Sequence, residues 1–277
     1  VRDPDKLGPF LSRQQSIDAI MNLLNEAYTD LKNSTISFPF TTSLALSTPT
    51  QLNISTSVAE FAKINRALAA RVAVYRQDWA TASTALSESF LSLNGDLNTG
   101  VYHRYSIAGG DELNPLFIPA NSPAAENRLT HPSFITEASP NDNRVSSKVA
   151  LRNSPGFQDG LQSSYDFLLY KSNTAPIPII RNEELILLYA EVKAQTNMFT
   201  DAVNAINTIR NAAGIGNYGG AQTMAALITE ILRQRRYSLF GEGHRWIDLR
   251  RYNRLNELPK DRGNDDVWSQ FPQPANE

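Results

Sequence analysis

Residues 231–251 read ILRQRRYSLFGEGHRWIDLRR, and the fold of the end of the chain depends on this stretch. The helix that leads into it has four apolar residues at the spacing of a buried stripe: Leu227, Ile228, Ile231 and Leu232. Gly241 and Gly243 bracket Glu242, which predicts that the helix ends there in a tight turn. A second short helix is predicted after the turn, because apolar residues recur every three positions, at Trp246, Leu249 and Tyr252.

Charged residues are packed among these apolar positions. Because a buried unpaired charge is costly, they must be paired or solvated. The stretch is therefore either a charged active site or a structural ion-pair lattice. No nucleophile or metal cluster lies nearby, which favours a lattice made of Arg235, Arg236, Glu242, Arg245 and Asp248. The expected pairs join Arg245 to Asp248 or Glu242, and join Arg235 or Arg236 to an acid outside the stretch.

The overall composition excludes several classes of protein. The 277 residues carry a net charge of −2, so neither a nucleic-acid partner nor a polybasic membrane patch is indicated. There is no cysteine, which excludes thiol catalysis and thiolate metal sites. No apolar run has the length of a membrane span. The chain begins VRDPDKLGPF, which we interpret as a fragment or a processed product.

Amphipathic periodicity predicts an early helix and two helical hairpins. Apolar residues spaced for one helical face run through residues 16–31. The first hairpin comprises Val58–Arg76 and Trp79–Leu93, with a turn at Gln77 and Asp78. The second comprises Glu183–Thr196 and Thr200–Ala213. A further helix, capped by Thr223, leads into residues 231–251.

The two hairpins align without gaps at an offset of 120 residues. Ala70 and Ala190 match on the first helices, and Ala82 and Ala202 match on the second. Small residues at these positions let the two helices of each hairpin approach closely, with an aromatic residue closing the turn: Trp79 in one and Phe199 in the other. This pattern is typical of tetratricopeptide-type repeats. The alternative is a chance match between two unrelated amphipathic hairpins.

The region between the hairpins, residues 94–182, is rich in Gly, Pro, Asn and Ser, with extended segments expected at 164–171 and 176–180. Long loops in compact domains are usually functional or disordered, and the many aromatic rings here argue against disorder. Aromatic faces cover the apolar side of sugar rings, and Asn and Arg bind their hydroxyls. The candidate ligand-binding residues are Tyr102, Arg104, Tyr105, Asn121 and Tyr165. The alternative is that most of these rings belong to the core.

Recognised chemical motifs do not explain the chain. Residues 214–219 spell GxGxxG, but they follow a predicted helix and not a strand, so a helix C-cap and loop are expected. The three histidines are far apart and lack metal-ligand spacing. GxSxG is absent. We therefore expect no catalytic residues, no metal and no cofactor.

In order along the chain, several motifs resemble the SusD/RagB family. They are PIPIIR at 176–181, ELILLYAE at 184–191, NAINTIRNAAG at 204–214, EGHRWIDLRR at 242–251 and a proline-containing tail at 271–277. Gln234 and Ser238 stand where the family usually has glutamates, so the expected ion-pair lattice has fewer carboxylates around Arg235 and Arg236. In the tail, Trp268 and Phe271 are expected to anchor the chain to the body.

The resemblance implies a mainly α-helical, SusD-like single domain over residues 1–277. It has tetratricopeptide-like hairpins at about 13–93 and 183–255 and a loop-rich, ligand-facing region at about 94–182. It also implies non-catalytic binding of oligosaccharide at the cell surface for a TonB-dependent, SusC-like transporter, with membrane attachment only through a lipid anchor absent from this chain. No ligand residue carries over from the motifs. The alternative function is a protein-interaction scaffold without direct sugar binding.

Overall fold

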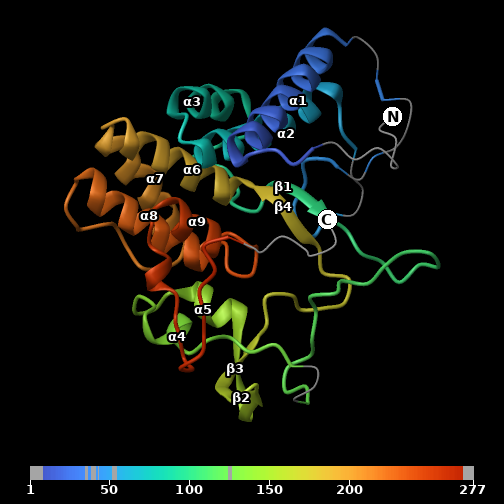
Figure 1. The fold of residues 1–277 in the computed structure, drawn as a ribbon. Coiled ribbons are helices and arrows are strands. Elements are labelled where there is room, and N and C mark those ends of the chain that lie inside the picture. Colours follow the sequence, from blue (N-terminus) through green and yellow to red (C-terminus); the bar gives the residue numbers. More distant parts are fainter. Residues whose placement is uncertain are drawn as a thin grey trace.

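The computed structural model describes residues 9–34, 37–38, 42, 44–51, 55–123 and 127–270. Helices form one part of the molecule, and a smaller part contains short helices, a hairpin and long loops (Figure 1). The long helices are α1 Arg13–Asn33, α2 Val58–Arg76, α3 Trp79–Glu88, α6 Asn182–Gln195, α7 Phe199–Ala212, α8 Met224–Ser238 and α9 Arg245–Arg251. The short ones are α4 Ser133–Thr136, α5 Asn143–Lys148 and the 3-10 helix Leu255–Glu257.

The helix starts follow from local capping chemistry. Ser57 and Glu60 form a reciprocal capping box at the start of α2, which satisfies backbone donors that the helix itself cannot pair. Gln77 ends α2 in the left-handed conformation, with φ 63°. Asp78 then caps α3 through the backbone of Thr81. The turn predicted at Gln77 and Asp78 is therefore confirmed.

Helix α3 ends at Glu88, five residues before the predicted end at Leu93. Ser89 adopts an extended conformation, and its hydroxyl donates to Leu86 O at 2.7 Å. The same hydroxyl oxygen accepts a hydrogen bond from Leu91 N at 3.1 Å. Serine side chains compete with helical backbone bonds in this way, so the helix stops where Ser89 offers an alternative.

The tetratricopeptide-like pairing is confirmed. Ala70, Ala82, Ala190 and Ala202 are all 0% exposed, as close helix approach requires. The pair α2 and α3 shares one apolar core with the inner face of α6, and a second core joins α6, α7 and α8. Helix α6 is buried on nearly its whole circumference and lies between the two cores.

Two small antiparallel sheets accompany the helices. Strand β1 (Gly100–His103) pairs with β4 (Ile177–Arg181), and β2 (Val149–Gln158) pairs with β3 (Leu161–Phe167). The extended segments were predicted near β3 and β4, whereas β1, β2, α4 and α5 were not predicted. A Cβ at position 100 would lie 2.4 Å from Ile180 O, so the β1–β4 contact needs glycine there.

The remaining sequence expectations have mixed outcomes. Gly214 follows α7 with φ +76°, so the GxGxxG segment is a helix end and loop, as expected. Trp268 is 53% exposed, and it contacts the body through its backbone oxygen, which accepts from Trp246 Nε1 at 2.9 Å. Phe271 and the tail motif at 271–277 lie outside the described residues. Within the part of the chain that the structure describes, no helix is both long and apolar enough to cross a membrane.

Candidate functional site

Three charged residues of 231–251, Arg235, Asp248 and Arg251, belong to a buried ion-pair network between α8 and α9. Asp248, which is 2% exposed, accepts from Arg235 Nε at 2.6 Å and from Arg251 Nη2 at 3.0 Å. Arg251 also holds Glu191 of α6, which is 0% exposed. Burial alone would raise the pKa of Asp248, but the two guanidiniums hold it below its usual value.

The network continues into the first hairpin through α6. Arg71 of α2 binds both carboxylate oxygens of Glu184 at 2.6 Å. His244 lies between Glu184 and Tyr75, whose hydroxyl is 2.9 Å from His244 Nδ1. Burial lowers the pKa of His244 to about 4, although the Glu184 carboxylate acts in the opposite direction. The imidazole is therefore neutral near pH 7.

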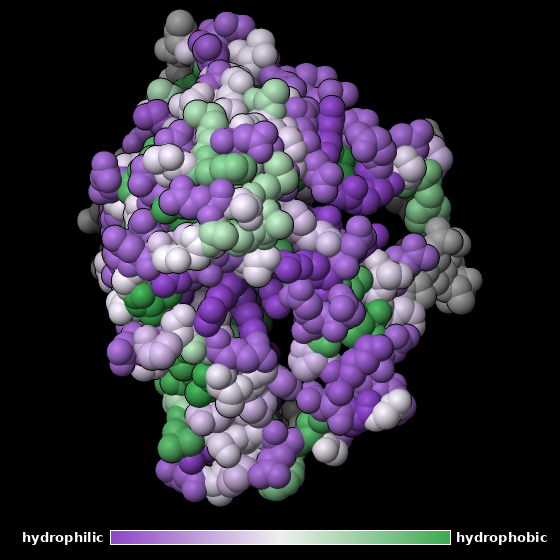
Figure 2. Space-filling view, turned by 90° about the vertical axis from the view of Figure 1, so that its left-hand side faces the viewer, coloured by the Kyte–Doolittle hydropathy of each residue, from purple (hydrophilic) through white to green (hydrophobic). Residues whose placement is uncertain are grey.

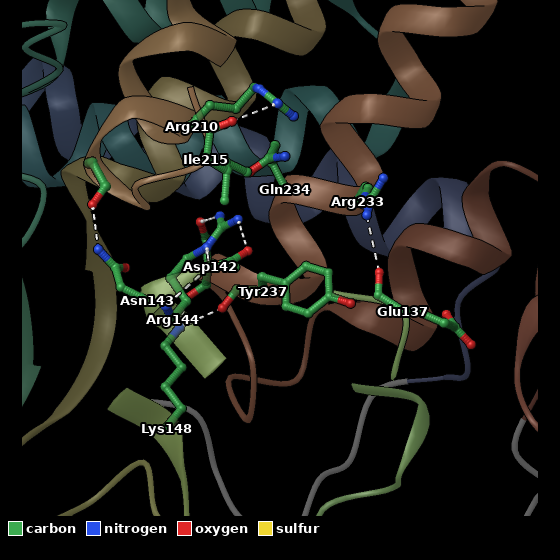
Figure 3. A network of polar contacts seen from close by, with 12 residues as sticks. Glu137, Asp142, Asn143, Arg144, Lys148, Arg210, Ile215, Arg233, Gln234 and Tyr237 are labelled. Atoms are coloured by element: carbon green, nitrogen blue, oxygen red, sulfur yellow. Dashed lines mark hydrogen bonds and ion pairs between the residues drawn. The ribbon is translucent and has the colours of Figure 1, made fainter. Parts of the chain in front are cut away.

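A second network ties the loop-rich part to the end of α8. Lys148 donates to Tyr237 O and Ser238 O at 2.6 Å each. Arg144 binds Asp142 and donates to Ser238 Oγ at 3.0 Å (Figure 3). Burial lowers the pKa of Lys148 to about 8, although the carboxylate of Glu183 opposes this effect. These contacts satisfy carbonyl groups that the end of α8 leaves free.

The expected ion pairs are correct in part. Arg236 pairs with Glu137, an acid outside 231–251. The pairing expected for Arg245 is wrong, because its carboxylate partner is Glu257 at 3.9 Å. Asp248 is instead held by the arginines Arg235 and Arg251.

The other expected partner of Arg245 is also engaged elsewhere. Glu242 is held by Arg181 of β4 at 2.8 Å, a residue that sequence reasoning did not include. Gln234 and Ser238 do not interrupt the networks: both are 0% exposed, and Gln234 donates to Glu230 Oε1 at 2.8 Å. Neutral side chains thus fill these positions by hydrogen bonding.

Beside the ion-pair network of α8 and α9, which we call the α8–α9 clamp, lies a groove of two adjacent cavities. We call it the α4 groove. The first, of about 510 Å³, lies between residues 131–137 and the α8–α9 turn and reaches residues 257–259. The second, of about 540 Å³, lies between residues 129–132, the β2–β3 turn and residues 261–262. His131 lines both cavities. Figure 2 shows a hollow at the level where the helical and loop-rich parts meet, on a largely hydrophilic surface.

The groove combines aromatic and polar groups. Phe240 and Trp246 line the first cavity together with Arg236, Arg245 and Glu257. Gln162, Asp159 and Arg262 line the second, in which His131 Nε2 is 3.0 Å from Asp261 Oδ2. Such a lining offers apolar faces and hydrogen-bonding groups side by side. Among the described residues, no group of three or more acidic or histidine side chains is placed to hold a metal ion.

The five candidate ligand residues do not form one cluster. Tyr102 is 3% exposed and its hydroxyl donates to Asn98 O, so its ring is part of the core. Arg104 donates to Ser47 Oγ at 2.8 Å beneath the loop that follows β1. Asn121 is exposed and accepts from Asn153 N at 2.7 Å.

Tyr165 belongs to β3, whose Asp166 accepts a hydrogen bond from Asn121 N at 2.6 Å. Tyr165 packs into a small core with Phe134 and lines an open cleft of about 670 Å³ on the other side of α4. Tyr105 is half-buried. Of the five, Tyr105 and Tyr165 therefore keep partly accessible rings, and the α4 groove was not predicted.

The fold is similar to that of several solved proteins. The structure resembles a SusD superfamily protein from Parabacteroides distasonis, with 16% identity over 90% of this chain and 61% of that chain, at a TM-score of 0.61. It also resembles surface glycan-binding protein A from Bacteroides thetaiotaomicron, with 18% identity over 94% of this chain and 66% of that chain, at a TM-score of 0.66. At these identities the likeness shows the fold.

In sequence, residues 159–276 match the model of the SusD family. The resemblance drawn from the motifs is thus confirmed. Surface glycan-binding protein A has also been solved in complex with laminarihexaose. The chain spans about 61% and 66% of the lengths of the two relatives above. No curated protein sequence matches the chain.

Proposed function

We propose that this chain binds an oligosaccharide in the α4 groove without catalysing its conversion. The observation that carries the proposal is the position of the groove: its first cavity is built largely from residues 235–259, within the part that matches the SusD family. A relative with the same fold has been solved with laminarihexaose. We further propose that the protein acts at the cell surface, held by a lipid anchor, and delivers its ligand to a TonB-dependent transporter.

The lining of the groove supports a sugar ligand. Trp246 provides a large ring next to Arg245 and Glu257, which suits a saccharide whose C–H face is apolar and whose edge bears hydroxyls. The two cavities meet at His131, so an extended chain of several sugar units fits better than a single ring. Of the four groove acids, Glu137 and Glu257 pair with arginines, Asp261 faces His131 and Asp159 is exposed.

Calorimetry against a panel of oligosaccharides tests this proposal. Trp246→Ala is expected to weaken binding by about 1–3 kcal/mol, the range for losing one stacked ring at an interface. Tyr105→Ala is the matched control, because Tyr105 lies on the separate loop after β1. Binding lost in Tyr105→Ala but kept in Trp246→Ala would place the ligand on that loop and reject the groove. Absence of binding to every saccharide would reject the function.

A second candidate function, a scaffold for a protein partner, is favoured by the surface between α1 and α9. A cavity of about 620 Å³ there is lined by Arg13, Ile20, Ile247 and Arg250, and Ile20 is 46% exposed. Exposed apolar residues flanked by arginines are typical of interaction sites. Capture of a transporter from outer membranes that is lost in Ile20→Asp but kept in His131→Ala, a change confined to the α4 groove, would support this second function.

A further inference from the structure

Next to the α4 groove lies a separate cavity of about 480 Å³, which we call the arginine cavity. Its charged lining consists of Arg233, Arg236, Arg245, Arg254, Glu137 and Glu257. It therefore carries four positive and two negative groups, a local charge of +2 on a chain whose net charge is −2. Such an excess of one charge in a concave site attracts ions of the opposite sign.

Only one of the two carboxylates, that of Glu257, faces two arginines. Glu137 pairs with Arg236 through its side chain and accepts from Arg233 Nη2 through its backbone oxygen at 3.1 Å (Figure 3). Glu257 lies 2.8 Å from Arg254 Nε and 3.9 Å from Arg245 Nη2. The cavity thus has two carboxylate groups for four guanidinium groups, and its positive charge is not neutralised by the protein.

Arg245 is the least satisfied of the four. Its side chain is 30% exposed, and the 3.9 Å contact with Glu257 exceeds hydrogen-bond length. Among the described residues its guanidinium finds no hydrogen-bond acceptor, although it carries five N–H donors. Burial, followed by repulsion from Arg236, lowers the pKa of Arg245. An anion between Arg236 and Arg245 would relieve that repulsion.

We propose that the arginine cavity binds the anionic group, a carboxylate or sulfate, of an acidic saccharide that lies in the α4 groove. Glu137, Arg236, Arg245 and Glu257 line both the cavity and the groove, so a substituent on a sugar in the groove reaches these arginines. A planar guanidinium binds carboxylate and sulfate-type oxygens with two parallel hydrogen bonds. The inference rests on the proposed function, which it narrows to acidic glycans.

The test compares a uronic-acid oligosaccharide with a neutral oligosaccharide of the same length, by calorimetry at fixed ionic strength. The wild type is expected to prefer the acidic ligand. Arg245→Gln is expected to weaken acidic binding by about tenfold or more, as loss of a charge-assisted bidentate contact implies. The neutral ligand is expected to lose much less affinity than the acidic one, because the Gln amide can still donate a hydrogen bond to a sugar hydroxyl. Glu257→Gln removes a competing carboxylate and is expected to strengthen acidic binding.

Inorganic sulfate, measured by thermal shift against chloride of equal ionic strength, separates the cavity from the groove. A rise in melting temperature that is specific to sulfate and absent in Arg245→Gln supports the cavity as an anion site. Equal binding of acidic and neutral ligands, unaffected by Arg245→Gln, overturns the inference while the proposed function stands. Sulfate binding without binding of any saccharide supports the anion site and rejects the proposed function. Arg128→Gln is the matched control, because Arg128 is exposed and lines neither the groove nor the arginine cavity.

Discussion

Replacing Asp248 by Ala tests how much the α8–α9 clamp contributes to the fold. The change removes the carboxylate that both Arg235 and Arg251 contact. Arg251 keeps Glu191, whereas Arg235 is 1% exposed and keeps only a 3.5 Å contact to His244 Nδ1. Its Nη1 is already buried without a hydrogen-bond partner. The variant therefore leaves an uncompensated guanidinium in the protein interior.

The expected cost follows from this arrangement. Removing one partner of a buried ion pair lowers the free energy of unfolding by about 3–5 kcal/mol, a large share of the roughly 5–15 kcal/mol that stabilises a typical domain. At about 2–4 °C per kcal/mol for a chain near this size, the melting temperature should fall by about 10 °C. Oligosaccharide affinity, measured below the melting temperature, should change little because Asp248 is 2% exposed.

Urea unfolding followed by circular dichroism gives the free energy directly. Asp18→Ala is the matched control, because Asp18 forms an exposed pair with Arg76 and should change stability by less than about 1 kcal/mol. The double variant Arg235→Met, Asp248→Leu should lose less stability than the sum of its single changes, because it removes both charges and leaves Arg251 with Glu191. Additive losses, or equal losses in Asp248→Ala and Asp18→Ala, would refute the reasoning.

Three further outcomes are expected. The pKa of His244 in the folded chain, about 4, lies below its unfolded value, so the unfolded chain binds the proton first and stability falls as pH drops from about 6.5 towards 4. At pH 5 the loss in the free energy of unfolding is about 2 kcal/mol. Urea unfolding of His244→Gln should lack this pH-dependent loss. Gly241→Ala should cost about 1–3 kcal/mol in thermal melts, since φ is +76° and a Cβ would meet the Phe167 ring at 2.7 Å, whereas Gly219→Ala meets nothing within 4 Å and should be neutral. Arg71→Ala should destabilise by about 3–5 kcal/mol, as it strips a buried Glu184 of its bidentate partner; a loss below 1 kcal/mol by urea unfolding would count against the network.

The helical hairpins were predictable because the sequence signals that define each hairpin are local. Within one hairpin, about 35 residues contain the apolar periodicity, the capping residues and the small residues that face each other. Helix α2 begins and ends where predicted. Strand β2 was missed for a local reason as well. It contains Pro155 and Gly156 at an irregularity in its register with β3, and both residues normally argue against a strand.

The ion-pair partners and the groove were not predictable in the same way. Arg251 and Glu191 are 60 residues apart, and Arg71 and Glu184 are 113 apart. Sequence spacing indicated that the charged residues of 231–251 need partners. It did not indicate which distant acid the fold would bring next to each arginine. The α4 groove joins residues 131–137 to 239–259, segments that no local pattern links. Tyr102 was selected for its ring, yet tertiary packing buries it.

Helix α6 makes the two halves of the helical part depend on each other. It places Glu183, Glu184 and Glu191 in the interior, and their cationic partners come from β4, α2 and α9. Residues 176–251, which contain most of the family motifs, include two of these partners but not Arg71. Expressed alone, that segment would expose one side of α6 and leave Glu184 without its guanidinium. The most recognisable part of the sequence is therefore not an autonomous folding unit, and a transplanted or shortened version needs to retain α2 as well.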